Sequence, residues 1–208
     1  LMFLGWNPGG ENEIYSLDEF VKDFDIKRVH KTDLVAFDRE KLLWLNGHYI
    51  RKMPLAKLCK AIKEWSERFN VDLKCSEFEL DYHLKVLEMV KERMKVFSDY
   101  VSLTHYFYHD SKVNTELLYK YAKSQERGQE ILSNIFELLE NMDATPWKVE
   151  DLEKVCHEYL ENSDYKTKEF FMTLRVAVTG ETATPPILEV MELLGKEIVI
   201  KRLQSVLK

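Results

Sequence analysis

Apolar residues recur every three or four positions along most of the chain, which is the period of an amphipathic helix. The apolar sets lie at positions 17–24, 42–50, 55–69, 80–97, 117–121 and 131–139. Alternating apolar and polar positions, which mark a half-buried strand, form no convincing series. The first fifteen residues and the segment Val29–Phe37 are less regular and leave room for a short strand pair. The pattern therefore predicts an all-α fold.

Side chains that can cap helices stand before several of these sets. Two pairs have the spacing of a capping box, in which each member hydrogen-bonds the backbone of the other. The pairs are Ser16 with Glu19 and Ser76 with Glu79, and further single caps are Asp38 and Asn114. These positions predict where four of the helices begin.

Proline and glycine mark other helix ends. Thr145–Pro146 and Thr184–Pro185 each place a hydroxyl before a proline, which suits the N-cap and the first helical position. Gly180 and Gly195 stand where the C-terminus of a helix favours a left-handed residue. Gly128 falls within a helical region, and we expect it to weaken or divide that helix.

Pro54 interrupts the helical pattern directly after Met53 and predicts a domain boundary there. A softer boundary is predicted between Tyr108 and Asn114, after a compact aromatic stretch. The chain has no internal repeat, low-complexity tract or flexible Gly/Ser linker. The predicted units are a small, mostly helical segment at 1–54 and a helical unit at 55–208, with sub-bundles at about 55–110 and 111–208.

Composition indicates an ordinary globular chain, because 45% of the 208 residues are hydrophobic and 32% are charged. The apolar runs are far too short to span a membrane, and Leu1–Gly5 lack the features of a signal peptide. Cys59, Cys75 and Cys156 are widely spaced, and they suit small apolar positions in helices in a reducing compartment. We therefore expect a cytoplasmic protein with no membrane partner.

Motifs for catalysis are missing from the sequence. No G-x-G-x-x-G or Walker loop is present. His105 and His109 have the i, i+4 spacing that can offer two imidazoles to a metal, but neighbouring aromatic residues favour a packing role. Acidic residues such as Glu158 and Glu161 suit the solvated face of a helix better than acid–base catalysis. The sequence predicts no catalytic residue, no cofactor site and no metal site.

Four groups of segments resemble one known family. They are Leu4–Pro8 with Glu13–Leu17, Phe37–Arg51, Leu174–Gly180 with Thr184–Pro185, and Leu193–Glu197. In this order, they resemble the stretches of bacterial glutamyl-tRNA synthetases that follow the catalytic signature loop. Each segment is short, but four in family order from both ends of the chain make the resemblance specific.

The resemblance implies a stem-contact segment at 1–54 and an all-α, superhelical anticodon-binding domain at 55–208. It also implies that the catalytic domain lies upstream, so that this chain alone is a non-catalytic part of a glutamate–tRNA ligase. ATP and Mg²⁺ would serve the whole enzyme, and no cofactor is expected in this part. The expected partner is tRNA(Glu), with tRNA(Gln) left open, and the expected state is a monomer.

The resemblance further assigns contacts to the anticodon. Arg175 matches the arginine that reads the first base, and Arg93 falls where an arginine faces the third base. Thr184, Pro185 and Ile187 align with residues that pack against the bases. The chemistry agrees, because a guanidinium offers a planar donor fork and a stacking face to unpaired bases. Without the resemblance, the two arginines fit surface ion pairs and Thr184–Pro185 fits a helix cap alone.

Two residues of the second group, Tyr49 and Arg51, are candidate contacts to the inner corner of the tRNA. Tyr49 equally fits a core aromatic position, and we expect Trp44 to be one.

The last helical set is locally basic. Its cations are Lys196, Lys201, Arg202 and Lys208. They fit either a row of phosphate contacts or cations placed favourably near a helix C-terminus.

The alternative function is a helical protein–protein scaffold with no nucleic-acid role. The net charge of −6 and the abundant amphipathic helices favour it. Bulk charge does not decide between the two functions, however, because phosphate contacts need only a local basic face.

Overall fold

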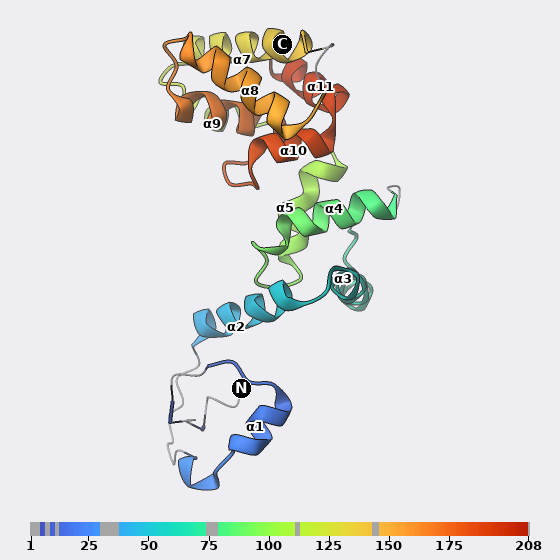
Figure 1. Cartoon of the computed structure of the whole chain (residues 1–208). Helices are drawn as coiled ribbons and strands as arrows, with labels where there is room; N and C mark the ends of the chain where they lie inside the picture. The colour runs from blue at the N-terminus through green and yellow to red at the C-terminus, as the bar shows by residue number, and fades with distance from the viewer. Residues whose placement is uncertain are drawn as a thin grey trace.

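The computed structural model describes residues 5–6, 9–10, 13–29, 38–73, 79–110, 113–142 and 146–207. These residues form eleven α-helices and one 3₁₀ helix (Figure 1). Their extended pairing is limited to an isolated antiparallel bridge between Trp6 and Val29. The all-α prediction is confirmed. Positions named above that lie outside the described residues are Leu1, Leu4, Pro8, Phe37, Cys75, Ser76, Thr145, Lys208 and most of the suggested strand segment 29–37.

The helices follow one another along an elongated molecule (Figure 1). At one end lie α1 (Leu17–Asp23) and the 3₁₀ helix (Ile26–Arg28). There Trp6 is buried and makes an edge-to-face contact with Phe20, with 5.3 Å between the ring centroids. From this end α2 (Arg39–Lys52) leads to α3 (Leu55–Phe69).

The middle of the molecule is built from α3, α4 (Leu80–Lys91) and α5 (Asp99–Tyr108), in which α4 packs against both neighbours. The far end is a bundle of shorter and longer helices (Figure 1). They are α6 (Thr115–Tyr119), α7 (Gln125–Glu140), α8 (Val149–Glu161), α9 (Thr167–Thr179), α10 (Ile187–Leu194) and α11 (Lys196–Leu207). In this bundle α11 packs against α7, α9 and α10, and α8 packs against α10. No described helix is both long and apolar enough to cross a bilayer.

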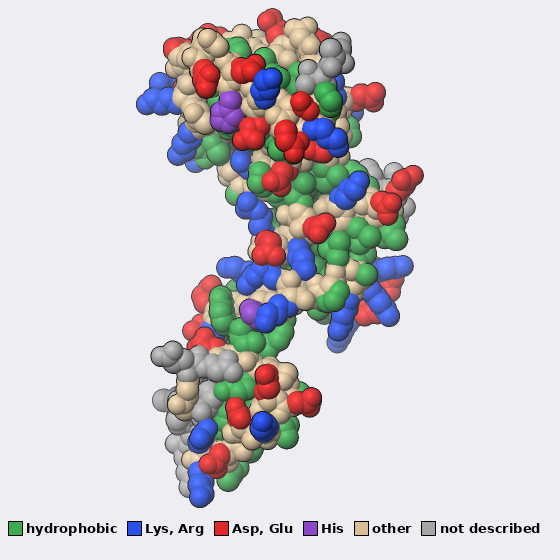
Figure 2. Space-filling model, viewed as in Figure 1, with side chains coloured by type: hydrophobic (Ala, Val, Ile, Leu, Met, Phe, Trp, Pro, Cys, Tyr) green, Lys and Arg blue, Asp and Glu red, His purple; other side chains and the backbone are tan. Residues whose placement is uncertain are grey.

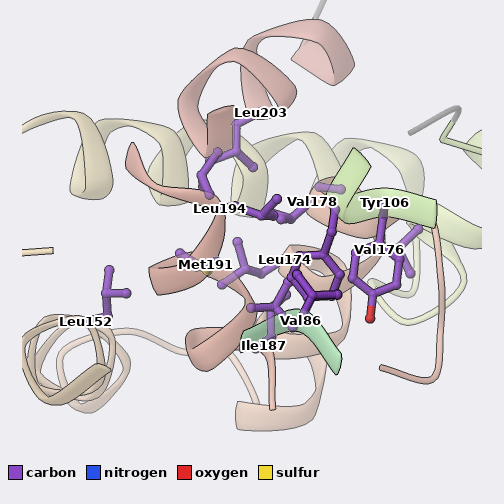
Figure 3. Close-up of a cluster of buried hydrophobic side chains, with 14 of the residues drawn as sticks. Val86, Tyr106, Leu152, Leu174, Val176, Val178, Ile187, Met191, Leu194 and Leu203 are labelled. Carbon is purple, nitrogen blue, oxygen red and sulfur yellow. The ribbon is translucent and has the colours of Figure 1, made fainter. Parts of the chain in front are cut away.

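One cluster of buried apolar side chains runs from the middle of the molecule into the bundle. Figure 3 shows part of it, where Val86 of α4, Leu174 of α9 and Ile187 of α10 contribute to a shared interior. Fully burying one such side chain contributes about 1.5–3 kcal/mol. The bundle and the middle helices are therefore joined by a common core.

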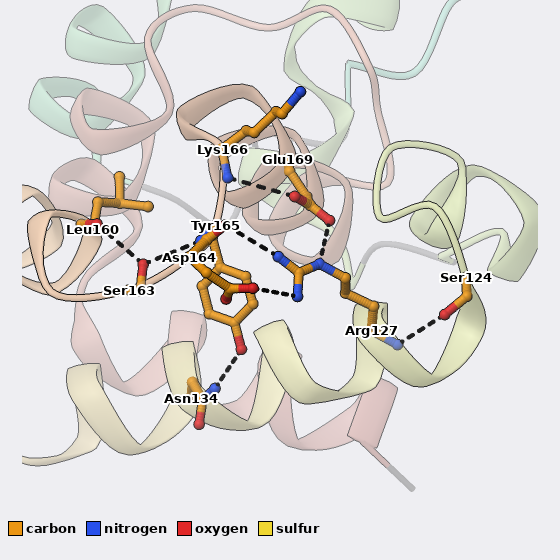
Figure 4. Close-up of polar contacts among 9 residues, drawn as sticks. All are labelled: Ser124, Arg127, Asn134, Leu160, Ser163, Asp164, Tyr165, Lys166 and Glu169. Carbon is orange, nitrogen blue, oxygen red and sulfur yellow. Dashed lines mark hydrogen bonds and ion pairs between the residues drawn. The ribbon is translucent and has the colours of Figure 1, made fainter.

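A charged network joins α7 to the start of α9 (Figure 4). The Nε–H group of Arg127 donates to the carboxylate of Glu169 at 2.7 Å, and Nη1 donates to Asp164 at 3.3 Å. The guanidinium also lies over the ring of Tyr165, 4.7 Å from its centroid. Glu169 in turn accepts the backbone N–H at the N-cap of α9 at 3.4 Å. The network fixes the start of α9.

Three predicted caps are confirmed. Ser16 and Glu19 form a capping box at the start of α1, with both reciprocal hydrogen bonds present. Asp38 accepts the N–H of Lys41 at 2.9 Å, and Asn114 caps α6. Of the second predicted box only Glu79 is described, and it precedes α4.

The predicted glycine ends are also confirmed. Gly180 ends α9 with φ +76°, and Gly195 ends α10 with φ +81°. Gly180 adopts the left-handed helical conformation, whereas Gly195 combines a positive φ with an extended ψ of 158°. A positive φ costs a residue with a side chain extra energy but costs glycine none.

Gly128 does not divide the helix, because α7 runs through it without a break, and its weakening of α7 stays a prediction. A Cβ atom there would lie 2.8 Å from Cε1 of Tyr119 and closer still to its Cδ1. Glycine therefore serves close packing between α6 and α7, which outweighs its low helix propensity.

The two Thr-Pro predictions are wrong as helix starts. α10 begins at Ile187 with Pro186 as its N-cap, and α8 begins at Val149 with Lys148 as its N-cap. The hydroxyl of Thr184 bonds a side chain of α9 instead of a helix N–H. Tertiary contacts therefore replace the local capping that the pattern predicts.

Candidate functional site

Arg175 lies near the end of α9, and its guanidinium is turned onto the loop that leads to α10. Its Nη1 group donates to the carbonyl oxygens of Thr184 at 3.1 Å and Pro185 at 2.9 Å, and also to the Thr184 hydroxyl. Its Nε is buried and has no hydrogen-bond partner in the described part of the chain. Nη2 makes no hydrogen bond within the same residues, so it is the nitrogen left for a ligand.

The loop between α9 and α10 brings three predicted site residues together. Thr184, Pro185 and Ile187 are all buried, and the Thr184 hydroxyl also donates to the Pro185 carbonyl at 2.8 Å. Their side chains therefore shape the loop from inside, with Arg175 holding its backbone. Their contact with bases stays a prediction.

Arg93 lies in the turn that follows α4, where its backbone N–H donates to the Val90 carbonyl at 2.9 Å. The side chain is exposed and has no hydrogen bond or ion pair among the described residues. Burial, and next to it the charge of Arg93, lower the pKa of Arg175. The two predicted arginines, from different helices, therefore lie within electrostatic range of each other.

Sequence reasoning missed Tyr106, a residue of α5 that is 1% exposed. Its hydroxyl is buried without a hydrogen-bond partner in the described ranges. Burial raises the pKa of Tyr106 far above its ordinary value, while the charges of Arg93 and Arg175 oppose this rise. An unpartnered buried hydroxyl costs about 1–3 kcal/mol. The aromatic stretch gave no local signal for it, because the same pattern is typical of core packing.

Glu181 adds one carboxylate to this site. It lies in the α9–α10 loop, and its oxygen is 3.6 Å from Nε2 of His105 on α5. Its charge acts on the Tyr106 hydroxyl, in the direction opposite to the arginines. The charges of two cations and one anion therefore act on this buried hydroxyl. Such a set can donate hydrogen bonds to a planar group rich in acceptors, or bind an anion.

The histidine pair does not support a metal centre. Nδ1 of His105 hydrogen-bonds the carbonyl of Ser102 at 3.0 Å, and the backbone N–H of His109 bonds the carbonyl of His105. Across the described ranges, no group of three or more His, Cys, Asp or Glu residues is placed to hold a metal ion.

Tyr49 and Arg51 lie on α2, nearer the α1 end of the molecule than the α9–α10 loop (Figure 1). The Tyr49 hydroxyl donates to the Tyr15 carbonyl at 2.9 Å, while the ring is largely exposed. The same helix lies against the turn that carries Arg93, because the side-chain amide of Asn46 donates to the carbonyl of Lys95. Trp44 on the same helix is 46% exposed, so its predicted core position is wrong.

The basic residues of α11 do not form one phosphate-facing row. Arg202 is buried and donates to the carbonyls of Val178, Tyr106 and His109 at 2.6–2.9 Å. It therefore serves the C-terminal ends of α9 and α5, where a cation is favourable. Lys201 pairs with Asp110 at 3.0 Å. On the face in Figure 2, other Lys and Arg side chains gather around the middle of the molecule, while acidic ones gather over α8.

Comparison with known proteins matches residues 55–207 to a family model described as an anticodon binding domain. The chain is 32% identical to a glutamate–tRNA ligase of Clostridium botulinum, over 98% of this chain and 41% of that protein. It is 29% identical to glutamate–tRNA ligase 2 of Caldicellulosiruptor saccharolyticus, with the same two coverages. The chain thus spans about two fifths of the length of the curated relatives it matches.

A solved structure is similar over almost the whole chain. It is a glutamate tRNA ligase from Elizabethkingia meningosepticum in complex with its amino acid, with a TM-score of 0.79 and 28% identity. The match covers 98% of this chain and 39% of that one. A second, from Elizabethkingia anophelis, has a TM-score of 0.77.

Proposed function

This chain belongs to the anticodon-binding domain family, and from that premise we propose that it binds the anticodon of tRNA(Glu) as part of a glutamate–tRNA ligase. The observation that carries the proposal is that Arg175 holds the α9–α10 loop while the exposed Arg93, from the turn after α4, lies close enough for its charge to act on Arg175. Anticodon bases are unpaired, so a protein can spread them apart and hydrogen-bond their edges. Arginine suits this task because its donor fork is planar and permanently charged.

The two arginines differ in how many of their donor groups are available to a base. Arg93 is exposed and uncommitted within the described residues, so its whole donor fork can meet a base. Arg175 keeps Nη1 on the Thr184–Pro185 backbone and offers Nη2. Arg175 thus links the loop to the base, and Thr184, Pro185 and Ile187 hold the loop in shape. Tyr49 and Arg51 would contact a separate part of the tRNA, at its inner corner.

In such a ligase, we infer that ATP-dependent attachment of glutamate belongs to the part of the relatives that this chain does not match. ATP and Mg²⁺ would be bound there. The proposed working state is a cytoplasmic monomer. The protein–protein scaffold is the less favoured function, because the family match and the arginine site both favour RNA.

Replacing Arg93 by alanine tests the proposal with little structural damage, because this side chain makes no hydrogen bond or ion pair among the described residues. A filter-binding titration would use tRNA(Glu), tRNA(Gln) and tRNA(Glu) carrying each single anticodon substitution. We expect Arg93→Ala to lose about 1–3 kcal/mol of binding free energy and to relax discrimination at one anticodon base.

The matched control is Arg68→Ala, which removes an exposed arginine on α3. It should leave anticodon discrimination unchanged. Binding by the parent chain should also weaken steeply with salt, because phosphate contacts release counterions. A parent chain that binds tRNA(Glu) no better than bulk RNA refutes the function and supports the scaffold. Comparable binding of tRNA(Gln) would extend the partner class.

A further inference from the structure

Two buried polar groups, one on α5 and one on α9, lie without hydrogen-bond partners among the described residues. One is the Nε–H group of Arg175, which can only donate, and the other is the hydroxyl of Tyr106, which can accept. Both are unpaired within the described part of the chain, and the charge of Arg175 acts on Tyr106. Buried polar groups are nearly always hydrogen-bonded, so two complementary exceptions at one site need an explanation.

The surrounding contacts fix Tyr106 firmly in place. Its backbone carbonyl accepts a hydrogen bond from the buried Arg202 at 2.6 Å, and its ring packs against Phe107 with 4.6 Å between centroids. The preceding residue, His105, contacts Glu181 of the loop. The backbone and ring of Tyr106 are therefore held in place, close enough to Arg175 for the charge of the guanidinium to act on the hydroxyl.

We propose that Tyr106 is a positioning residue of this site: its hydroxyl accepts the Nε–H of Arg175 when a base at Nη2 draws the guanidinium into its binding orientation. This inference rests on the proposed function. In the complex, Nη1 keeps its hydrogen bonds to the loop, Nη2 donates to the base and Nε–H donates to the Tyr106 hydroxyl. Each nitrogen of the guanidinium then has a partner of its own. The free protein lacks the Nε bond, and binding supplies it.

The arrangement makes the effect of removing the hydroxyl unusual. In the free protein, Tyr106→Phe deletes a buried group that has no partner, so the melting temperature should stay the same or rise. In the complex, the same change removes a hydrogen bond to a charged group, so the affinity for tRNA(Glu) should fall roughly tenfold. Tyr106→Phe should therefore lower the affinity for tRNA(Glu) without lowering the melting temperature.

Two variants make the test specific. Tyr100→Phe is the matched control, because Tyr100 is another buried tyrosine of α5 whose hydroxyl is bonded to Tyr108 at 2.7 Å and to His83 at 2.9 Å. It should lower the melting temperature and leave tRNA affinity unchanged. Arg175→Lys keeps a cation but has no Nε–H, so adding Tyr106→Phe to it should cause no further loss of affinity.

The measurements are thermal melts and titrations of the four variants and the parent chain with tRNA(Glu) and with an anticodon-substituted tRNA(Glu). The proposal is overturned if Tyr106→Phe binds as the parent does, or if its loss persists in the Arg175→Lys background. A joint loss of melting temperature and affinity also overturns it, since that marks a packing residue. If the parent chain itself ignores the anticodon substitution, the proposed function has failed and this inference falls with it.

Discussion

Replacing Arg127 by methionine should destabilise the chain strongly, because it leaves a buried carboxylate without its cation. Glu169 is 3% exposed, and Arg127 supplies its 2.7 Å hydrogen bond and neutralising charge. Breaking a buried ion pair by removing one partner costs about 3–5 kcal/mol. The side chain of Arg127 is 22% exposed, so water reaches part of the pair. We therefore expect the lower end of that range, about 3 kcal/mol.

Urea unfolding followed by circular dichroism would measure this loss as a change in the free energy of unfolding. In a thermal melt, the same loss lowers the melting temperature by about 2–4 °C for each kcal/mol in a chain of this size. The matched control is Lys154→Met, which breaks an exposed i, i+4 pair with Glu158 on α8. Exposed pairs contribute little, so the control should change stability by less than about 1 kcal/mol.

A double variant separates the buried charge from simple loss of packing. Adding Glu169→Met to Arg127→Met removes the stranded carboxylate and should recover most of the loss, since apolar replacements of a buried pair are often neutral. The reasoning is refuted if Arg127→Met is as harmless as Lys154→Met. It is equally refuted if the double variant is no more stable than Arg127→Met alone.

Other predictions concern pH and glycine. Burial raises the pKa of Glu169, but the hydrogen bonds from Arg127 and from the Lys166 backbone, with the charges of Arg127 and Lys123, together hold it below the ordinary 4.5. The stabilisation from this carboxylate is therefore present above that value and lost as pH falls through the folded-state pKa. The stability difference between the parent and Arg127→Met should shrink as the pH of the urea titrations is lowered below 4.5. Gly180→Ala should cost about 1–2 kcal/mol in the same assay, because φ there is +76°, and a cost near zero would contradict the left-handed cap. Gly128→Val should cost about 1–3 kcal/mol by crowding Tyr119, and a fully stable variant would show that this contact is loose.

Features that depend on neighbours in sequence could be predicted. The caps at Ser16, Asp38 and Asn114 involve hydrogen bonds to residues two or three positions away, so the local pattern contains all of their chemistry. The helical period likewise reports which face is buried, and the all-α class followed from it.

Features that depend on the meeting of distant helices could not be predicted. Arg202 reads as a surface cation, but its hydrogen-bond acceptors come from α5 and α9 and from the turn after α5. Trp44 reads as a core aromatic, yet the face of α2 that carries it is open enough to leave the side chain 46% exposed.

The candidate site combines residues that the sequence could predict with one that it could not. Family resemblance pointed to Arg93 and Arg175, and the structure brings them within electrostatic range. The environment of the unpaired Tyr106 hydroxyl involves α5, α9 and the turn after α4, so no motif within one of these segments could predict it.

The form of α2 has a consequence for long ligands. This helix of 14 residues buries only Gly47 and Ile50 and leads from the α1 end to the rest of the molecule. It acts as a stiff spacer of about 21 Å, set by the rise of 1.5 Å per residue. Inserting one residue would lengthen it by about 1.5 Å and rotate the α1 end by about 100°. A ligand that is bound both at the α1 end and at the rest of the molecule would therefore fit only one length of α2.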